Sequence, residues 1–499
     1  MSQAQSTGVY KNFIGGKWVE SISGETYRTV NPARPKQVVG EFQASVVKDA
    51  DSAIAAAAAA APAWGKMPAA QRGSLLFKTI DVFERRAGEL ARAITIEEGK
   101  PIADATGEVK RAMNILEYAA GEGRRLFGYT TPSELPDTAA YTFKRPLGVV
   151  SIITPWNFPV AIPVWKMAPA LICGNAIVFK PASATPFAAT VIAEIFEEAG
   201  LPAGVFNLIT GPGGSIGNKL VEDPRIGGVS FTGSTEIGTR IYARGAEALK
   251  KVQAELGGKN AAIIMNDADL DKAVPGVVQG AFGSTGQRCT ATSRAIVQKG
   301  VYNEFMDRLV AQTKALKVGD GMDPDYDVAP LSSKSQFNTV REYIGYGTEE
   351  GAKLVTGGHA LEGPEYEGGY YVEPTIFTDV PENSRIAQEE IFGPVLSVFQ
   401  AEDVQDAVRI SNSVKFGLSS SIYTRDLVQA HEYINTVETG MVHVNAPTLG
   451  GEVHLPFGGL KSSGVGQREQ GTEAFDFFTE TITAYIDYSA SARERSRFI

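Results

Sequence analysis

One cysteine lies in a sequence context that favours nucleophilic chemistry. Cys289 follows Arg288 in a turn rich in Gly, Ser and Thr, whereas the other cysteine, Cys173, lies in the apolar run 170–174. A neighbouring guanidinium lowers the pKa of a thiol, and the thiolate is its reactive form. Cys173 is interpreted as a small buried hydrophobic residue. The sequence therefore predicts Cys289 as the reactive cysteine, with Arg288 lowering its pKa.

Two polar residues elsewhere are candidates to assist this thiol. The segment 154–159 reads Thr-Pro-Trp-Asn-Phe-Pro, and Asn157 between its prolines can direct its amide at a developing oxyanion. The alternative for this segment is a packed aromatic turn. Glu255 begins the string Glu-Leu-Gly-Gly-Lys between two series of α/β elements. Taken alone, Glu255 is a solvent-exposed carboxylate before a loop.

Two glycine-containing turns are candidates for phosphate binding. In 231–238, Phe-Thr-Gly-Ser-Thr-Glu-Ile-Gly, a strand ends, Gly233 turns and Ser234 can cap a helix whose free N–H groups suit a phosphate. The alternative is a well-capped helix with no ligand. The run 211–217, Gly-Pro-Gly-Gly-Ser-Ile-Gly, has one residue too many for the G-x-G-x-x-G fingerprint, so a plain turn is the simpler interpretation.

The elements that must position these residues alternate along the chain. Short apolar runs that we expect to be strands cover 148–154, 176–179, 205–209 and 228–232, with helical stretches at 187–199 and 216–221. Such alternation predicts a parallel, doubly wound sheet that binds ligands at the carboxyl ends of its strands. A second alternating series over 261–444 predicts a second α/β domain.

The N-terminal quarter is expected to be mostly helical. After a hairpin at 13–19, helical patterns cover 49–63, 71–98 and 107–127, and Pro62 is expected to end the first of them. The charge-free run 146–165 is long enough to span a membrane, but it contains Pro155, Pro159 and Pro163. Because proline interrupts helices, this run is predicted to be a buried strand followed by a turn. Candidate strands at 142–145 and 482–488 flank the two domains.

Composition excludes several classes of protein. The 499 residues are 43% hydrophobic and 21% charged, as in a globular protein of about three domains or two large ones. The net charge of −10 argues against nucleic-acid and anionic-membrane binding. Two cysteines and four histidines provide neither a disulfide framework nor closely spaced metal ligands. With no signal peptide expected at the N-terminus, a reducing, cytoplasmic location is expected.

Taken together, these strings resemble the NAD(P)-dependent aldehyde dehydrogenase superfamily, in its hydrolytic branch that does not use coenzyme A. The resemblance extends from about residue 10 to residue 488 and rests on seven motifs in the family's order, at 155–159, 179–181, 231–234, 255–259, 286–289, 390–394 and 456–461. It implies an α/β fold with two doubly wound domains and a bridging β-arm. The implied boundaries are 1–125 and 147–257 for a Rossmann-like cofactor domain, 258–455 for a catalytic domain, and 126–146 with 478–499 for an arm that forms a homodimer or homotetramer.

The resemblance also implies roles for individual residues. Cys289 would attack an aldehyde and pass through a thiohemiacetal to a thioester, Asn157 would hold the oxyanion, and Glu255 would activate the hydrolytic water. The residues implied to bind NADP or NAD are Thr154, Trp156, Lys180, Ser183, Gly213, Gly233, Ser234, Leu256, Glu390 and Phe392.

Two departures from the family pattern affect these expectations. Many NAD-preferring members carry Glu three residues after the lysine, where this chain has Ser183. Without that carboxylate Lys180 can meet a 2′-phosphate, so NADP is expected to be preferred, unless other groups still hold NAD. The string 464–469 has one residue more than the common Gly-x-Gly-Arg-Glu, so the sequence assigns no relay role to Glu469.

The substrate is the least defined feature. Trp165 and Phe457 suggest an apolar, aromatic wall, whereas Arg288 could contact a substrate carboxylate or merely pair with a nearby acid. The strings 287–293 and 453–459 are similar to a prokaryotic subgroup that oxidises 2-oxoglutarate semialdehyde (2,5-dioxopentanoate). The alternative is a broad-specificity aliphatic or aromatic aldehyde dehydrogenase. A cysteine hydrolase would need a paired histidine, and a protein that had lost catalysis would be expected to lack Cys289, Glu255 or Asn157.

Overall fold

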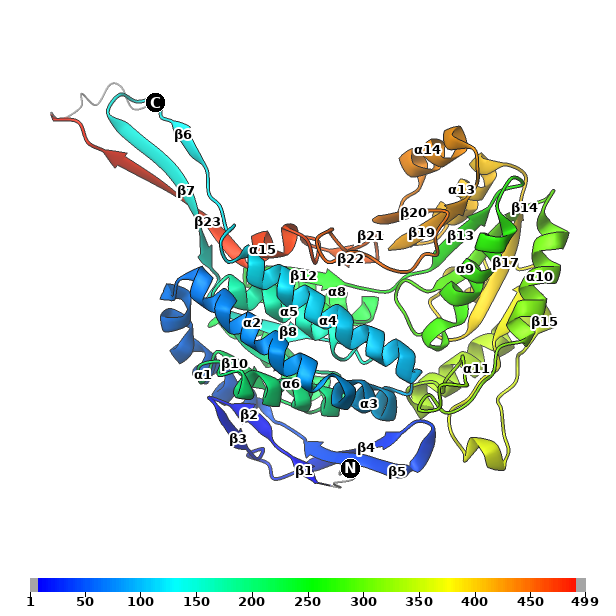
Figure 1. The fold of residues 1–499 in the computed structure, drawn as a ribbon, viewed down its shortest axis with the longest axis horizontal. Helices are drawn as coiled ribbons and strands as arrows, with labels where there is room; N and C mark the ends of the chain where they lie inside the picture. The colour runs from blue at the N-terminus through cyan, green and yellow to red at the C-terminus, as the bar shows by residue number, and fades with distance from the viewer. Residues whose placement is uncertain (1–7, 491–499) are drawn as a thin grey trace.

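The computed structural model describes residues 8–490. Figure 1 shows two α/β bodies side by side and a narrow arm that projects from the first body. Residues 1–7, at which no signal peptide is expected, and residues 491–499, which end the expected arm segment, lie outside the described part of the chain.

The first body contains an eight-stranded sheet with a parallel centre. In spatial order its parallel strands are β12 (Lys251–Glu255), β11 (Ile226–Thr232), β8 (Val149–Ile153), β9 (Ala176–Lys180) and β10 (Phe206–Leu208). Antiparallel strands complete the two edges, namely β22 (Gly464–Val465) and the hairpin of β2 (Asn12–Ile14) and β3 (Lys17–Val19). Strands β8, β9 and β10 are buried at every residue, which explains their continuous apolar runs.

The chain order along this sheet reverses between β8 and β11. From β8 the chain moves to β9 and β10 on one side, and it then returns to β11 and β12 on the other. Loops that leave the carboxyl ends of β8 and β11 therefore diverge and leave a crevice, which is where such sheets bind ligands. This topology brings the segments 154–159 and 233–238 to the same crevice.

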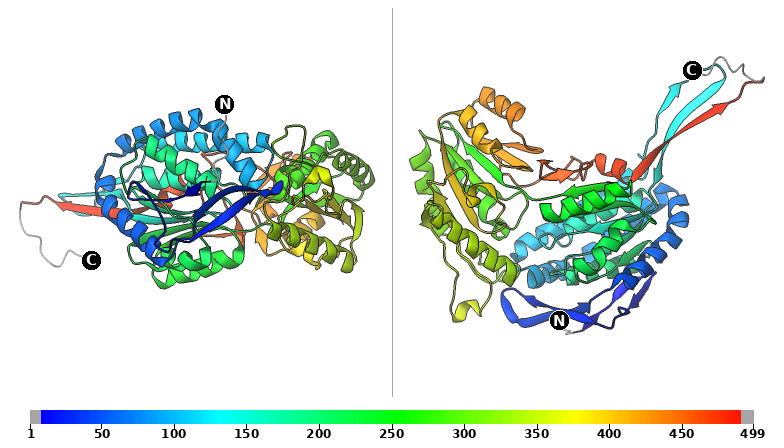
Figure 2. Two further views of the ribbon diagram at one scale, coloured as in Figure 1. Left: turned by 90° about the horizontal axis from the view of Figure 1, so that it is seen from below. Right: turned by 180° about the vertical axis from the view of Figure 1, so that it is seen from behind.

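Helices cover both faces of this sheet (Figure 2). One face packs against α5 (Ala161–Ile172) and α6 (Pro186–Glu198), and the other against α1 (Val47–Lys66), α7 (Gly213–Glu222) and α8 (Thr235–Glu247). An outer layer on α5 and α6 consists of α2 (Ala69–Arg85), α3 (Ala87–Glu98) and α4 (Ile102–Glu122). Of these helices, α4 packs directly on α5.

The second body is a seven-stranded sheet built in the same way. Its strand order is β15 (Lys353–Thr356), β16 (Thr375–Thr378), β17 (Val395–Ala401), β14 (Thr292–Gln298), β13 (Asn260–Ile264), β19 (Ser419–Tyr423) and β20 (Met441–Val444), all parallel except β15. One face packs against α9 (Leu270–Phe282) and α10 (Tyr302–Lys314). The other packs against α11 (Lys334–Glu349), α12 (Arg385–Gln388), α13 (Val404–Asn412) and α14 (Leu427–Thr436). The predicted α/β fold with two doubly wound sheets is confirmed.

Smaller sheets complete the structure. The projecting arm is a three-stranded antiparallel sheet in which β7 (Thr138–Pro146) pairs with β23 (Thr479–Asp487) along its full length and with β6 (Thr130–Pro132) (Figure 1). A second three-stranded sheet contains β1 (Val9–Tyr10), β5 (Arg34–Gln43) and β4 (Thr26–Asn31). A two-stranded sheet joins β18 (Phe416–Gly417) to β21 (Leu460–Lys461), and a short helix, α15 (Glu473–Phe477), precedes the last strand.

Two expectations about prolines are wrong. Pro62 does not end α1, which continues to Lys66; Pro62 lies on the exposed face of the helix, while Trp64 beyond it is buried and donates a hydrogen bond to the Leu171 carbonyl. The packing of Trp64 therefore outweighs the loss of one helical hydrogen bond. The run 146–165 is a strand, a turn and the start of a helix, because Pro163 lies in the first turn of α5, where backbone N–H groups have no intrahelical partner.

Within residues 8–490, none of the helices combines the length and the apolar character that crossing a bilayer requires.

Candidate active site

The crevice between β8 and β11 opens into a cavity of about 780 Å³. The first body lines it with residues that follow its parallel strands, and the second body contributes Cys289, Gln336, Thr339 and residues 390–392. The predicted site residues on its wall are Thr154, Trp156, Asn157, Lys180, Gly213, Gly233, Ser234, Leu256, Cys289, Glu390 and Phe392. Segments that are far apart in the sequence therefore meet in one cavity between the two bodies.

The remaining predicted residues lie off this wall. Ser183 is behind it, where its hydroxyl donates to the Gly211 carbonyl at 2.9 Å. Trp165 and Phe457 form a separate aromatic contact, with ring centroids 5.2 Å apart. Glu255 and Arg288 point to other partners, described below.

The Cys289 thiol is not activated in the way that the sequence suggested. Burial, together with the negative charges of Glu390 and Glu255, raises the pKa of Cys289 to about 12. The expectation that Arg288 lowers this pKa is therefore wrong. The guanidinium of Arg288 instead donates to Asp104 Oδ2 at 3.0 Å and to Ser284 Oγ at 2.8 Å.

The turn before the nucleophile is held in an unusual backbone conformation. Ser284, Thr285 and Gly286 have φ of 48°, 59° and 68°, in the left-handed region that costs energy for residues with a Cβ. Thr285 Oγ1 donates to the Ala329 carbonyl at 2.8 Å, and Ser284 Oγ donates to Asp104 at 2.5 Å. These bonds compensate for the strain and fix the position from which Cys289 faces the cavity.

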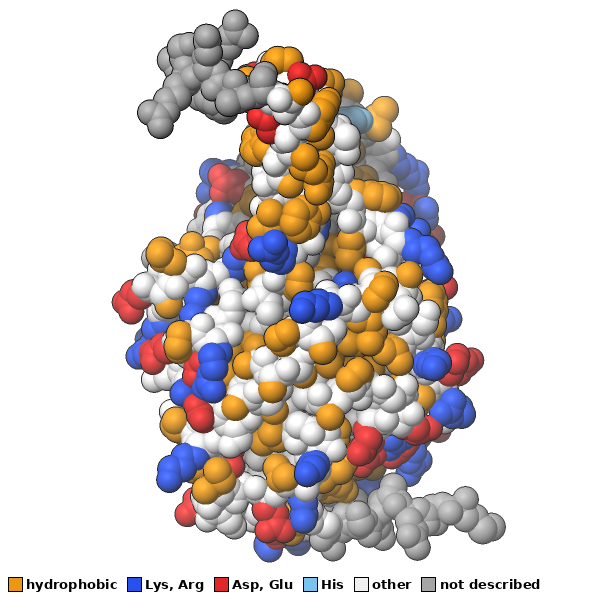
Figure 3. All heavy atoms as spheres, turned by 90° about the vertical axis from the view of Figure 1, so that its left-hand side faces the viewer, with side chains coloured by type: hydrophobic (Ala, Val, Ile, Leu, Met, Phe, Trp, Pro, Cys, Tyr) orange, Lys and Arg blue, Asp and Glu red, His pale blue; other side chains and the backbone are white. Residues whose placement is uncertain are grey.

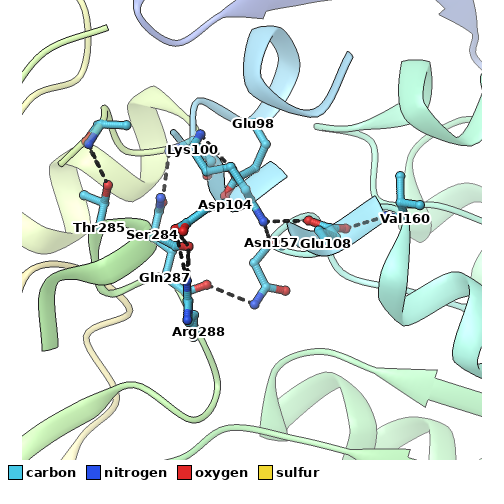
Figure 4. Close-up of polar contacts among 12 residues, drawn as sticks. Glu98, Lys100, Asp104, Glu108, Asn157, Val160, Ser284, Thr285, Gln287 and Arg288 are labelled. Atoms are coloured by element: carbon cyan, nitrogen blue, oxygen red, sulfur yellow. Dashed lines mark hydrogen bonds and ion pairs between the residues drawn. The ribbon is translucent and has the colours of Figure 1, made fainter. Parts of the chain in front are cut away.

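Figure 4 shows that α4 and Lys100, two residues before it, also hold Asn157 in place. Lys100 Nζ donates to the Asn157 carbonyl at 2.5 Å and to Glu108 Oε2 at 2.8 Å. Glu108 Oε1 in turn accepts from the backbone N–H groups of Val160 and Ala161, and it thereby caps the start of α5. The loop that carries Asn157 is thus tied to the same helix as the nucleophile turn.

The side-chain amide of Asn157 lies against the nucleophile turn. Its Nδ2 donates to the Gln287 carbonyl at 3.0 Å, two residues before Cys289. An asparagine amide has two N–H donors, so this bond leaves the second one to point elsewhere. The arrangement suits an amide that stabilises negative charge developing next to the thiol.

Glu255 is buried and faces away from the cavity wall. As the last residue of β12, it directs its carboxylate toward Gly458 and Gly464, where an added Cβ would collide with it or press on it. Burial raises the pKa of Glu255 well above its usual value, and the nearby Glu469 raises it further, while Lys166 opposes the rise. Glu255 Oε2 has no hydrogen-bond partner among the described residues. A rotation of the side chain is therefore needed before Glu255 can act in the cavity.

Glu469 lies next to Glu255 despite the additional residue in 464–469. Its carboxylate pairs with Lys166 Nζ, which also donates to Ser230 Oγ at 3.0 Å. Both members of this ion pair are buried. The sequence had given no reason to place Glu469 beside Glu255, and the structure does so.

Sequence reasoning missed a polar stripe on α4. Asp104, Glu108 and Arg111 follow one another at four- and three-residue spacing, which places them on one face of the helix. Asp104 and Glu108 hold the two loops described above. The spacing of charged residues on a helix with an otherwise buried face was the signal that could have identified them. Thr232 was also missed, although it is the last residue of β11 and lines the cavity.

The sequence profile of the aldehyde dehydrogenase family matches residues 18–484. The chain therefore belongs to the aldehyde dehydrogenase family, whose members oxidise aldehydes with NAD(P)⁺, and the predicted enzyme class is confirmed.

Several known proteins and solved structures are similar to this chain over nearly its whole length. The chain is 46% identical to the alpha-ketoglutaric semialdehyde dehydrogenase of Bacillus subtilis (strain 168), over 97% of this chain and 100% of the relative. It is 43% identical to the 2,5-dioxopentanoate dehydrogenase of Saccharolobus solfataricus, over 95% of this chain and 98% of the relative. Among solved structures, an NADP-dependent enzyme from E. coli superposes with a TM-score of 0.93 at 38% identity, over 96% and 98% of the two chains. Betaine aldehyde dehydrogenase from Staphylococcus aureus in complex with NAD⁺ superposes with a TM-score of 0.95 at 32% identity, over 98% and 96%.

Proposed function

We propose that this enzyme oxidises 2,5-dioxopentanoate to 2-oxoglutarate, with NADP⁺ as the preferred cofactor. The observation that carries the chemistry is the meeting of Cys289 and Asn157 on one cavity wall with the predicted cofactor residues. The substrate rests on relatives that are 43–46% identical to the chain, cover nearly all of it, and are named for this semialdehyde.

In the proposed reaction Cys289 Sγ bonds to the aldehyde carbon while the thiol proton passes to solvent water. The carbonyl oxygen becomes an oxyanion, which accepts from the Asn157 amide and the Cys289 backbone N–H. A dinucleotide held in this cavity would supply the hydride acceptor, and loss of the hydride would convert the thiohemiacetal on Cys289 into a thioester. Glu255 then turns toward the thioester and takes a proton from water, which attacks the acyl carbon and releases the carboxylate and the thiol.

The cavity has the groups that a dinucleotide needs. The hydroxyls of Thr154 and Thr232 are buried and have no hydrogen-bond partner among the described residues. Both residues line the cavity, so these hydroxyls are available to a ligand there. Ser234 caps α8, so the N–H groups of the first turn of this helix are available to a diphosphate. Glu390 accepts from the Gly258 N–H at 2.8 Å and is placed to contact a ribose. These residues would hold the cofactor, and Lys180 would face its adenosine ribose.

The preference for NADP⁺ follows from the charges near Lys180. Burial lowers the pKa of Lys180 to about 8, and its ammonium donates to the Pro181 carbonyl at 2.9 Å without an acidic partner among the described residues. Glu390 is the one carboxylate among the described residues on the cavity wall. Arg240 and Arg244 also line the cavity, and they pair with Glu236 and Glu222. A 2′-phosphate at Lys180 would thus meet a cation that has no ion-pair partner among the described residues.

We expect Ser183→Glu to reverse this preference. The wild type should use NADP⁺ at least about tenfold better than NAD⁺ in kcat/KM. A carboxylate at position 183 would repel the 2′-phosphate and should lower kcat/KM for NADP⁺ by about 100-fold, with NAD⁺ much less affected. Ser183→Gln is the matched control, because it adds the same bulk without charge. A wild type that strongly prefers NAD⁺, or a Gln variant as impaired as the Glu variant, would refute the proposal.

The substrate proposal is tested by initial rates of reduced-cofactor formation with 2,5-dioxopentanoate, succinate semialdehyde, hexanal and benzaldehyde. The expected result is that 2,5-dioxopentanoate exceeds the uncharged aldehydes by at least tenfold in kcat/KM, about 1.4 kcal/mol of transition-state stabilisation. Preference for hexanal or benzaldehyde would show that the wall of Trp165 and Phe457 selects the substrate, and it would exclude the proposed one.

We also propose that the arm formed by 126–146 and the strand β23 joins copies of this chain into a homodimer or homotetramer. Tyr129, Tyr485 and Tyr488 on the arm are 77%, 72% and 65% exposed. Figure 3 shows hydrophobic side chains gathered along the arm. Exposed aromatic surface of this extent is characteristic of protein interfaces.

A further inference from the structure

A second cavity lies beside the aromatic wall. It has a volume of about 360 Å³ and is lined by Gly107, Lys110, Arg111, Asn114, Gly451, Glu452, Val453 and His454. Arg111 connects this cavity to the wall, because its guanidinium carbon lies 6.0 Å from the ring centre of Trp165. The Trp165 ring in turn packs on Phe457.

Unlike Arg288 and Lys166, Arg111 carries a charge that no described carboxylate pairs with. Its guanidinium donates to the Gly451 carbonyl and, at 2.9 Å, to Gln470 Oε1, both of which are neutral. No carboxylate pairs with it among residues 8–490, whereas Arg288 pairs with Asp104 and Lys166 pairs with Glu469. A guanidinium has five N–H donors, so Arg111 retains donors for a ligand. Burial of a cation without a counter-charge is unfavourable, and a bound carboxylate would relieve it.

The remaining charges around this cavity do not neutralise Arg111. Glu452 is exposed and lies 3.4 Å from the His454 imidazole, with which it forms a contact on the rim. Lys110 is also exposed. The side of the cavity next to the aromatic wall therefore remains positive.

The aromatic wall links Arg111 to the nucleophile. Ile162 lines the main cavity with Cys289, and Trp165 follows it by three residues on the same face of α5. Cys289 and Val453 both pack against the hydrophobic cluster that contains Trp165 and Phe457. A short aldehyde that lies along this wall would have one end at Cys289 and the other toward Arg111.

We propose that Arg111 binds the carboxylate of the aldehyde substrate and makes the enzyme selective for aldehydes that carry an acid group. This inference deepens the proposed function and rests on it for the substrate class. The proposed carboxylate contact is therefore not Arg288, whose charge Asp104 already compensates. It is Arg111, which lies on the face of α4 that is directed toward the aromatic wall.

The test compares Arg111→Met with the wild type on 2,5-dioxopentanoate, succinate semialdehyde and hexanal. Loss of a charge-assisted contact should lower kcat/KM for both acids by about 100-fold. Hexanal has no carboxylate, so its kcat/KM should stay within about threefold, and this rate also reports that the variant is folded. Arg111→Lys keeps the charge without the planar guanidinium, so its kcat/KM for the two acids should lie between those of the wild type and Arg111→Met. Lys110→Met removes an exposed cation of the same cavity. Its kcat/KM for each of the three substrates should stay within about threefold of the wild-type value.

A second readout does not depend on which acid the enzyme prefers. In the wild type 2-oxoglutarate should inhibit hexanal oxidation, and in Arg111→Met its inhibition constant should rise by about 100-fold. Undiminished use of the acids by Arg111→Met, or an equal loss with hexanal, would overturn the role of Arg111. A wild type that prefers succinate semialdehyde but depends on Arg111 would instead overturn the proposed substrate and leave the carboxylate contact intact.

Discussion

Cys289→Ala should abolish aldehyde-dependent formation of NADPH, with turnover reduced by at least about 10⁴-fold. The reason is chemical, because Cys289 provides the one thiol among the described residues that line the cavity. Binding of NADP⁺ should survive, since the groups that would hold the dinucleotide lie after β8, β9 and β11. The measurement is steady-state absorbance at the NADPH maximum, paired with the shift in melting temperature that NADP⁺ produces.

Cys173→Ala is the matched control for this prediction. Cys173 is buried in the first body, its thiol has its pKa raised to about 12 by burial, and it does not line the cavity. The control should retain turnover within about threefold of the wild type. Substantial activity in Cys289→Ala would show that the thiol is not the nucleophile.

Glu255→Gln should separate hydride transfer from hydrolysis. Without the carboxylate no base takes the proton of water, so steady-state turnover should fall by about 100-fold or more. The formation of the thioester does not require this water, so rapid mixing should still show a burst of NADPH close to one per active site. The amide of glutamine has nearly the same size as the carboxylate, so the pocket formed by Gly458 and Gly464 stays filled.

The outcome of this experiment discriminates between two roles for Glu255. A burst that is lost together with steady-state turnover would indicate that Glu255 deprotonates the Cys289 thiol, whose pKa is raised to about 12. Unchanged turnover would exclude both roles. Glu469→Gln is a useful comparison, because it removes the neighbouring charge that raises the pKa of Glu255 but leaves Glu255 itself in place.

The fold was largely predictable because its strands are simple in sequence. Continuous apolar runs ended by glycine or proline identified β8, β9, β10 and β11, and their buried positions account for the pattern. The errors occurred at prolines, where tertiary packing competes with local propensity. Pro62 is tolerated because Trp64 is packed beyond it, and Pro163 because it lies in a first turn.

Site residues that belong to a sequence motif could be predicted. Contacts between residues that are far apart in the sequence could not. The strand-end residues Asn157 and Ser234 meet at one cavity, as motif order suggested. The partner of Arg288 is Asp104, which is 184 residues away in the sequence, so no local pattern could reveal that this guanidinium is neutralised. The orientation of Glu255 away from the cavity depends on packing against Gly458 and Gly464, which again no local pattern encodes.

Helix α4 emerges as the element that organises the site. One of its faces presents Asp104 to the nucleophile turn and Glu108 to the start of α5, and Arg111 to the aromatic wall. Through Lys100, which precedes the helix, Glu108 is also connected to the loop of Asn157. The relative position of the thiol and the amide is therefore set by a helix that lies outside the cavity wall.

In the proposed reaction Cys289 forms a thioester with the oxidised substrate, and Glu255 activates the water that hydrolyses it. The most direct measurement is the intact mass of Glu255→Gln after mixing with 2,5-dioxopentanoate and NADP⁺ and quenching in acid. We expect one acyl group in place of the thiol hydrogen, an increase equal to the mass of the aldehyde less two hydrogens, located on the peptide that contains Cys289. Formation of NADPH with no covalent adduct, or an adduct on another residue, would contradict it.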